Sequence, residues 1–179
     1  ATYLLQGDKQ VVELYDLATK KRIPTSINSR SGRQDAERFE KYASMAWDGN
    51  GQTLVSTLYR GKAYELVYFD RETGTISRVP LPDEIRRIQH ISWSPDGSKL
   101  LLSALNSITG TYGLYELPRE GEELIPLVKD PFDNLDPNLA SNSQSFYFSS
   151  NRDSIGIQVE GKHLSAYRTN FDLYRLDID

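Results

Sequence analysis

The sequence predicts an all-β protein built from repeated antiparallel sheets, and two observations support this. Its 179 residues include eleven Tyr, six Phe and two Trp but one Met, a composition that favours strands over helices. A nine-residue motif also recurs at a spacing of 46 residues, as Ala46–Leu54, Ser92–Leu100 and Asn138–Phe146. Internal repeats of this length are typical of solenoids and propellers.

Each copy of the motif predicts a β-hairpin. A first strand ends in a large apolar residue, and a turn rich in Gly, Asn, Asp and Ser follows, which are the residues that tight turns favour. The strand after the turn is almost continuously apolar, as expected for a strand covered on both faces. The large apolar residues are Trp47, Trp93 and Leu139, and the apolar strands cover 54–58, 100–104 and 146–149.

A third strand carrying a Tyr among aliphatic residues follows each hairpin, at 65–69, 113–117 and 172–176, and the same pattern occurs at 12–17. A short fourth strand is expected at 76–79. Four antiparallel strands in about 46 residues make one blade of a β-propeller. The prediction is a propeller segment of about four blades, two complete and two partial: a partial blade at 1–27, an insertion at 28–41, blades at 42–82 and 87–129, and a partial blade at 131–179 with a loop insertion at 153–170.

Incomplete blades at both ends would leave open strand edges, which pair readily with other strands. We therefore expect the chain to be one segment of a larger propeller of about six to eight blades. The remainder would come from the same polypeptide or from another chain.

The segment Ile91–Leu100 resembles the Trp-Ser-Pro-Asp-Gly signature of the TolB-type propeller repeat. The segments 136–137, 146–152 and 171–175 are similar to the same repeat. The resemblance covers roughly 42–179, although 48–51 and 140–143 lack the proline. It implies a propeller of the kind found in bacterial cell-envelope proteins, and hence a periplasmic or envelope location. A shared fold does not specify the function.

Several functions are excluded or disfavoured. The sequence has no G-x-S-x-G, H-E-x-x-H, Walker or G-x-G-x-x-G motif, so we expect no catalysis by this segment. Two His and no Cys predict no metal site and no cofactor. A net charge of −4 argues against nucleic-acid binding. No apolar run reaches the length of about 18 residues that a membrane span needs.

Three equivalent positions on the predicted first strands are candidates for a site in the central channel. Ser44, His90 and Asp136 are 46 residues apart, and first strands line the channel of a propeller. They could hold an ion or a small polar ligand, or they could simply bond neighbouring backbone. For Ser149–Arg152 we favour a structural role, because Thr57 and Ser103 are equivalent to Ser149 and suggest a position of blade packing.

The two longest irregular segments, 28–41 and 153–170, are expected on one face of the propeller. Long loops on a rigid scaffold often carry binding, and Arg and Tyr are favoured interface residues. Insertions also drift freely in surface loops, so the alternative is that they have no role. The candidate binding residues of this face are Arg30, Arg33, Arg38, His163, Tyr167 and Arg168.

The leading hypothesis is a non-catalytic propeller scaffold that binds a protein or peptide, in a bacterial cell envelope as the resemblance implies. One alternative is a propeller that gates substrate in a larger peptidase, similar to prolyl-oligopeptidase or tricorn-type enzymes. Another is a sugar- or ion-binding propeller with its site in the channel.

Overall fold

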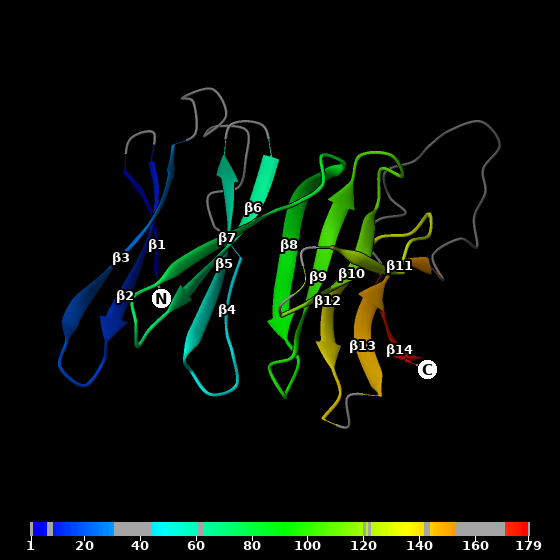
Figure 1. The fold of residues 1–179 in the computed structure, drawn as a ribbon. Coiled ribbons are helices and arrows are strands. Elements are labelled where there is room, and N and C mark those ends of the chain that lie inside the picture. Colours follow the sequence, from blue (N-terminus) through cyan, green and yellow to red (C-terminus); the bar gives the residue numbers. More distant parts are fainter. Residues whose placement is uncertain are drawn as a thin grey trace. The chain divides into compact units, whose positions relative to one another are not determined.

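The fold is all-β, and the chain divides into two compact units. The computed structural model describes residues 2–6, 9–30, 44–60, 63–119, 121, 123–141, 144–152 and 171–178. Unit 1 is Ala1–Asp83 and unit 2 is Glu84–Asp179, and each holds two antiparallel sheets (Figure 1).

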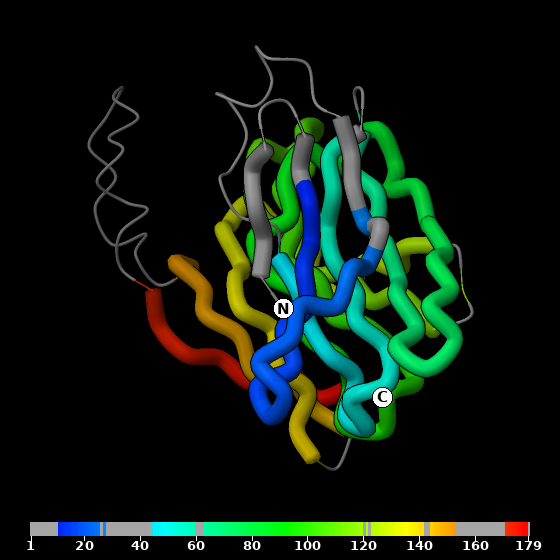
Figure 2. Tube along the Cα trace, turned by 90° about the vertical axis from the view of Figure 1, so that its left-hand side faces the viewer, coloured from blue at the N-terminus to red at the C-terminus, as the bar shows by residue number. Residues whose placement is uncertain are grey.

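In unit 1, one sheet has the order β1-β2-β3 and the other the order β4-β5-β6-β7. Figure 2 looks onto unit 1 from the side of β1–β3. The strands are β1 (Thr2–Gln6), β2 (Lys9–Asp16), β3 (Lys21–Arg30), β4 (Met45–Trp47), β5 (Thr53–Arg60), β6 (Ala63–Asp70) and β7 (Ile76–Pro80).

In unit 2, one sheet has the order β11-β10-β9-β8 and the other the order β12-β13-β14. The strands are β8 (Ile85–Trp93), β9 (Lys99–Asn106), β10 (Tyr112–Pro118), β11 (Ile125–Val128), β12 (Asn134–Leu139), β13 (Ser145–Ser150) and β14 (Asp172–Asp177).

Two four-stranded and two three-stranded sheets confirm the predicted fold class. Strand β3 continues to Arg30. The first three residues of the predicted insertion 28–41 are therefore strand. Its remainder and the whole insertion 153–170 lie outside the described residues.

Strand pairing confirms the 46-residue register of the first hairpin. Trp47 lies opposite Leu54 and Trp93 lies opposite Leu100. In the third copy Leu139 lies opposite Phe146. Because successive side chains of a strand point to opposite faces, a slip of one residue would reverse every buried position.

The hairpin turns share their backbone hydrogen bonds despite their different sequences. The Gly51 N–H donates to the Asp48 carbonyl and the Gly97 N–H to the Ser94 carbonyl, both at 2.9 Å. The two glycines have φ values of 70° and 69°, in the left-handed region that glycine adopts at little cost. The third copy keeps the bond that closes the hairpin, from Ala140 N–H to the Ser145 carbonyl at 2.8 Å.

Each of the first two turns contains one carboxylate, but at different positions. In the first turn, Asp48 Oδ1 accepts the N–H groups of Gln52 and Thr53 at 2.8 and 2.9 Å, and the Asn50 amide oxygen also accepts from Gln52. In the second turn, Ser94 stands at the position of Asp48 and Asp96 at that of Asn50. The Ser94 hydroxyl accepts the Lys99 N–H at 3.0 Å and donates to Asp96 Oδ1 at 2.6 Å.

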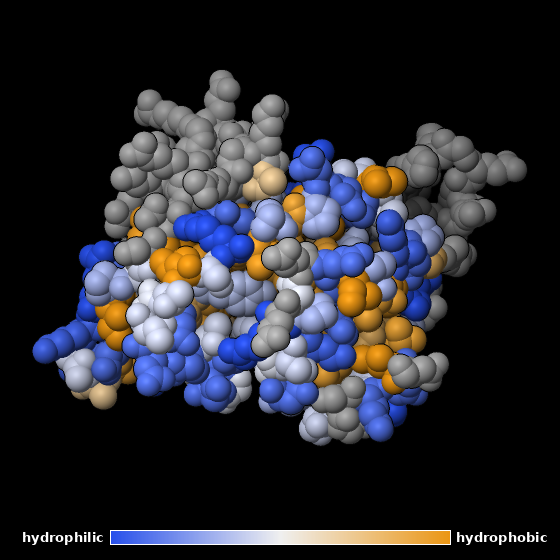
Figure 3. Space-filling view, viewed as in Figure 1, coloured by the Kyte–Doolittle hydropathy of each residue, from blue (hydrophilic) through white to orange (hydrophobic). Residues whose placement is uncertain are grey.

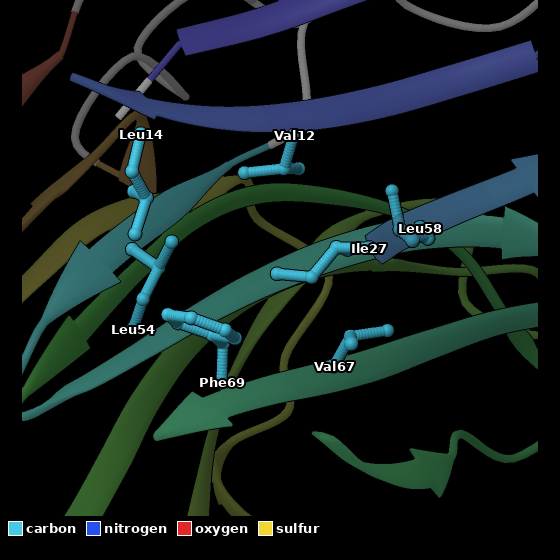
Figure 4. Packing of buried hydrophobic residues seen from close by; sticks show 7 residues of the cluster. All are labelled: Val12, Leu14, Ile27, Leu54, Leu58, Val67 and Phe69. Carbon is cyan, nitrogen blue, oxygen red and sulfur yellow. The ribbon is translucent and has the colours of Figure 1, made fainter. Parts of the chain in front are cut away.

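The core of unit 1 lies between its two sheets. Val12, Leu14 and Ile27 from β2 and β3 pack against residues of β5 and β6 (Figure 4). All members are at most 4% exposed, so the three-stranded sheet is held mainly by apolar burial. The residues contributed by β5 and β6 are Leu54, Leu58, Val67 and Phe69.

The core of unit 2 is similar, with Leu101 and Leu114 packed against Phe146 and Phe148. Apolar side chains also remain at the surface of unit 2, over the part that holds β11 to β14 (Figure 3). The most exposed on the last two strands is Leu173, at 74%.

We predict that Asn50→Asp destabilises the protein by about 1 kcal/mol, because it places a second carboxylate beside Asp48 in an exposed turn. The double variant Asp48→Ser/Asn50→Asp copies the second turn and should recover most of that loss. Urea unfolding of the two single variants and the double variant measures this coupling. Ser107→Asp adds the same charge to another exposed turn as a control. If the effects of the two substitutions on the free energy of unfolding were additive, the turn would not need to carry a single carboxylate.

Candidate functional site

The first candidate site lies where the edge strands β8 and β12 of unit 2 run beside each other. Two hydrogen bonds join the sheets there. The Ser92 hydroxyl donates to the Pro137 carbonyl at 2.6 Å, and the Ser103 hydroxyl donates to the Asn134 carbonyl at 2.7 Å. Ser103 and Asn134 are fully buried, so this junction is firmly held. The bond from Ser103 confirms the expected role of this position in blade packing.

Both strands are irregular at this junction. The register of β8 shifts between Ile88 and His90, and that of β12 shifts between Leu135 and Asn138. Asp136 has a φ of 52°, which is uncommon for a residue other than glycine. Bulges re-aim side chains and are over-represented near functional sites.

These bulges bring together two of the three predicted channel residues. His90 Nδ1 lies 3.7 Å from Asp136 Oδ1, and the two side chains are 34% and 57% exposed. The third residue, Ser44, belongs to unit 1. Its N–H donates to Thr57 Oγ1 and its carbonyl accepts the Thr57 N–H, both at 3.0 Å. The backbone of Ser44 therefore serves the fold, and a role of the three residues in a channel stays a prediction.

A second candidate region lies at the end of unit 2 that carries the β9–β10 turn. Here the Asn106 side chain accepts the Ile108 N–H at 2.8 Å, and the Gly110 N–H donates to the Asn106 carbonyl at 2.8 Å. Ile108 is 77% exposed at the tip of this turn. A well-bonded turn thus presents a large apolar side chain to solvent.

Arg152 fixes the neighbouring segment. Its guanidinium donates to Asp130 Oδ2 at 3.1 Å and to Asn134 Oδ1 at 2.9 Å. It also lies over the rings of Phe148 and Tyr174, at 5.1 and 4.8 Å from their centroids. These contacts confirm the predicted structural role of Arg152.

Further hydrogen bonds join this segment to the β9–β10 turn. The Thr111 hydroxyl donates to the Asp130 carbonyl at 3.0 Å, and the Tyr112 N–H donates to Asp133 Oδ1 at 3.1 Å. We call residues 106–112, 129–134 and 152 the loop platform. Sequence reasoning missed Ile108. The signal that could have identified it was a large apolar residue within the otherwise polar turn sequence Ser-Ile-Thr-Gly at 107–110.

None of the side chains predicted for the loop face is among those that the structure describes. Arg30 has its backbone in β3, while Arg33, Arg38, His163, Tyr167 and Arg168 lie outside the described residues. Their role in binding stays a prediction.

Asp96 has a perturbed carboxyl that belongs to the fold. The pKa of Asp96 is lowered to about 2 by hydrogen bonds from the Ser94 hydroxyl and then from the N–H and hydroxyl of Ser98. All these partners lie within the hairpin turn. The shift therefore reflects turn geometry rather than a catalytic site, although perturbed carboxyls often mark such sites.

Within the described part of the chain, no group of three or more His, Cys, Asp or Glu side chains could hold a metal ion. The described part of the chain also contains no helix that is long and apolar enough to cross a membrane.

Comparison with known proteins reveals similarity at the level of structure. No protein-family model and no curated protein matches the sequence. TolB from Acinetobacter baumannii superposes with a TM-score of 0.62 at 14% identity, over 98% of this chain and 37% of that one. The tricorn protease gives 0.60 at 14% identity, over 97% of this chain and 16% of that one.

A putative TolB from Agrobacterium tumefaciens gives a TM-score of 0.53 at 13% identity, over 96% of this chain and 62% of that one. The chain thus spans only part of each of these proteins. At such low identities the similarity establishes the fold, which is that of a β-propeller.

We predict that Ser94→Ala raises the pKa of Asp96 toward its ordinary value, because it removes the strongest hydrogen bond to the carboxylate. A lowered pKa in the folded state contributes stability above the unfolded pKa, and this is lost as pH falls through the folded pKa. The variant should therefore lose less stability than wild type between about pH 4 and 2. Carboxyl ¹³C titration by NMR measures the shift, with Ser107→Ala as control. An unchanged titration of Asp96 would contradict the assignment.

We predict that Arg152→Lys destabilises the protein by about 1–3 kcal/mol, because lysine cannot span both acceptors or stack on the rings. Arg175→Lys is the matched control, since Arg175 pairs with Asp177 while both side chains are more than half exposed. This control should cost less than about 0.5 kcal/mol. Urea unfolding compares the two, and equal effects would show that Arg152 does not organise the loop platform.

Proposed function

We propose that this chain is a non-catalytic β-propeller segment that binds a protein or peptide partner through the loop platform of unit 2. The observation that carries the proposal is the 77% exposure of Ile108 on a well-bonded turn. Loops that a rigid scaffold positions carry a disproportionate share of binding residues, and Ile108 stands on such a loop beside the other bonded segments of the loop platform.

Rigidity of the platform supports this proposal. Arg152 ties the β11–β12 connection to β13, and Thr111 and Tyr112 tie the same connection to β10. A surface that is already ordered loses little conformational entropy on binding. The insertion 153–170 follows Arg152 directly in the sequence, so its residues His163, Tyr167 and Arg168 are proposed as additional contacts.

The proposed compartment is the bacterial cell envelope. This rests on the resemblance of Ile91–Leu100 to the TolB-type repeat and on the structural similarity to TolB proteins. The remainder of the propeller is proposed to come from the same polypeptide or from another chain.

The test begins with crosslinking and affinity capture from an envelope fraction, followed by affinity measurements with the purified partner. Ile108→Glu should weaken binding at least tenfold, because it places a charge at the centre of the contact. Leu17→Glu is the matched control, since Leu17 is also a turn residue and is 90% exposed.

Equal affinities of Ile108→Glu and wild type would refute binding at the loop platform. A deletion of 153–170 and charge reversal of Arg30, Arg33 and Arg38 test the predicted loop face separately. Peptide hydrolysis by the intact protein would instead favour the propeller of a peptidase.

A further inference from the structure

We infer that the outer edge of β14 binds an extended segment of a partner protein, which adds to the sheet as an antiparallel fourth strand. Among the described residues, β14 pairs with β13 alone (Figure 1). The equivalent third strands, β6 and β10, also pair with a fourth strand, which is β7 or β11. Strand edges of this kind recruit extended peptides through backbone hydrogen bonds. The edge is a binding surface in addition to the loop platform, and the inference does not depend on the proposed function.

The backbone of β14 directs alternate residues toward this edge. The Ile178 N–H donates to the Gln144 carbonyl at 2.7 Å, which makes these two residues a hydrogen-bonded pair of the antiparallel ladder. Because hydrogen-bonded and non-hydrogen-bonded pairs alternate, the even-numbered residues of β14 bond to β13. The N–H and carbonyl groups of Leu173, Arg175 and Asp177 therefore point outward.

The apolar side chains of β14 are exposed on both faces of the sheet. Leu173 lies at the repeat position of Leu66 in β6 and Leu114 in β10. It is 74% exposed, whereas both equivalents are fully buried. On the opposite face Leu176 is 41% exposed, whereas its equivalents in β6 and β10 are at most 4% exposed. A neighbouring strand covers the flank of both faces, so this pattern indicates an edge that another strand can cover.

The fourth strands of the two complete sheets show which side chain fits opposite Leu173. Val79 of β7 lies opposite Leu66, and Val128 of β11 lies opposite Leu114. Cross-strand pairs of apolar and β-branched residues stabilise a sheet. We therefore expect the occupant to place a β-branched apolar residue opposite Leu173.

An ion pair in unit 1 defines the second feature of the occupant. Glu65 of β6 pairs with Arg78, the residue directly before Val79 in β7. Asp172 holds the repeat position of Glu65, since each stands directly before the compared leucine, and Asp172 is exposed. The occupant should therefore carry Arg or Lys directly before its β-branched residue, where the positive charge complements Asp172.

A second copy of β14 fits the edge less well than a strand of this type. An antiparallel pair that engages the outward groups of Leu173, Arg175 and Asp177 in both copies would place Arg175 opposite Arg175. Like charges directly opposite each other destabilise a sheet. The occupant is therefore a strand of another protein with the Arg-Val pattern of β7.

The test is an NMR titration of the whole chain with a synthetic peptide that has the sequence of residues 75–81, Thr-Ile-Ser-Arg-Val-Pro-Leu. We expect saturable shifts of the β14 amides. At saturation, hydrogen exchange should slow at Leu173 and Arg175, whose N–H groups point outward, and stay unchanged at Tyr174, whose N–H points to β13.

Modified peptides and protein variants locate the bound strand. N-methylation of the Val79 amide removes the donor that faces Leu173 and should weaken binding about tenfold. N-methylation of the Arg78 amide, which points away from β14, is the matched control. Arg175→Pro blocks strand addition and should abolish binding, yet proline is tolerated in an edge strand whose N–H faces solvent. Asp172→Lys should weaken binding of this peptide and favour a peptide that carries Arg78→Glu.

Ile108→Glu should bind the peptide as wild type does, which distinguishes this edge from the loop platform. Slow exchange of Leu173 and Arg175 without peptide, binding that survives Arg175→Pro, or equal affinities of the two N-methylated peptides would overturn the inference. A dimer of the peptide-free protein that Arg175→Pro dissociates would make a second copy the occupant and would also overturn it. Should Arg175→Pro fail to fold, the two N-methylated peptides decide with wild type.

Discussion

The hydrogen bond that closes the first hairpin in three of the four sheets is the constraint on which the rest of the structure depends. It joins Asp48 to Thr53, Ser94 to Lys99 and Ala140 to Ser145 at 2.8–3.0 Å. It fixes which residues of the following strand face the core, because alternate side chains point to opposite faces. The second residue of each of these strands is buried in all three copies: Leu54, Leu100 and Phe146.

The same constraint explains why the repeat was visible in the sequence although its copies differ. The turn needs an acceptor for the N–H groups that follow it, and either Asp48 or the pair of Ser94 and Asp96 provides one. Proline is not needed for this purpose, so its loss from the first copy leaves the turn intact. The spacing of 46 residues was therefore a better guide than identity of the motif residues.

The third strand shows where sequence reasoning fails. Tyr115 lies opposite Leu102 and Tyr174 lies opposite Phe148. Leu102 and Phe148 are 46 residues apart, so they hold equivalent positions in the repeat. The equivalent residue in unit 1, Ser56, faces Val67 rather than Tyr68. The tyrosines thus predicted the strands but not a common register. Valine and tyrosine suit a strand equally well, and the pairing partner alone decides which of them faces the core.

The pairing of His90 with Asp136 was half predictable for a related reason. The repeat spacing made His90 and Asp136 equivalent, but two bulges set their actual separation, and nothing in the sequence specifies a bulge in β8. Asp136 precedes Pro137, and the residue before a proline is normally extended, yet its φ is 52°. A backbone of this kind persists only where neighbouring bonds over-determine it. The hydrogen bonds to Pro137 and Asn134 do so, and they thereby place the Asp136 carboxylate beside the His90 imidazole.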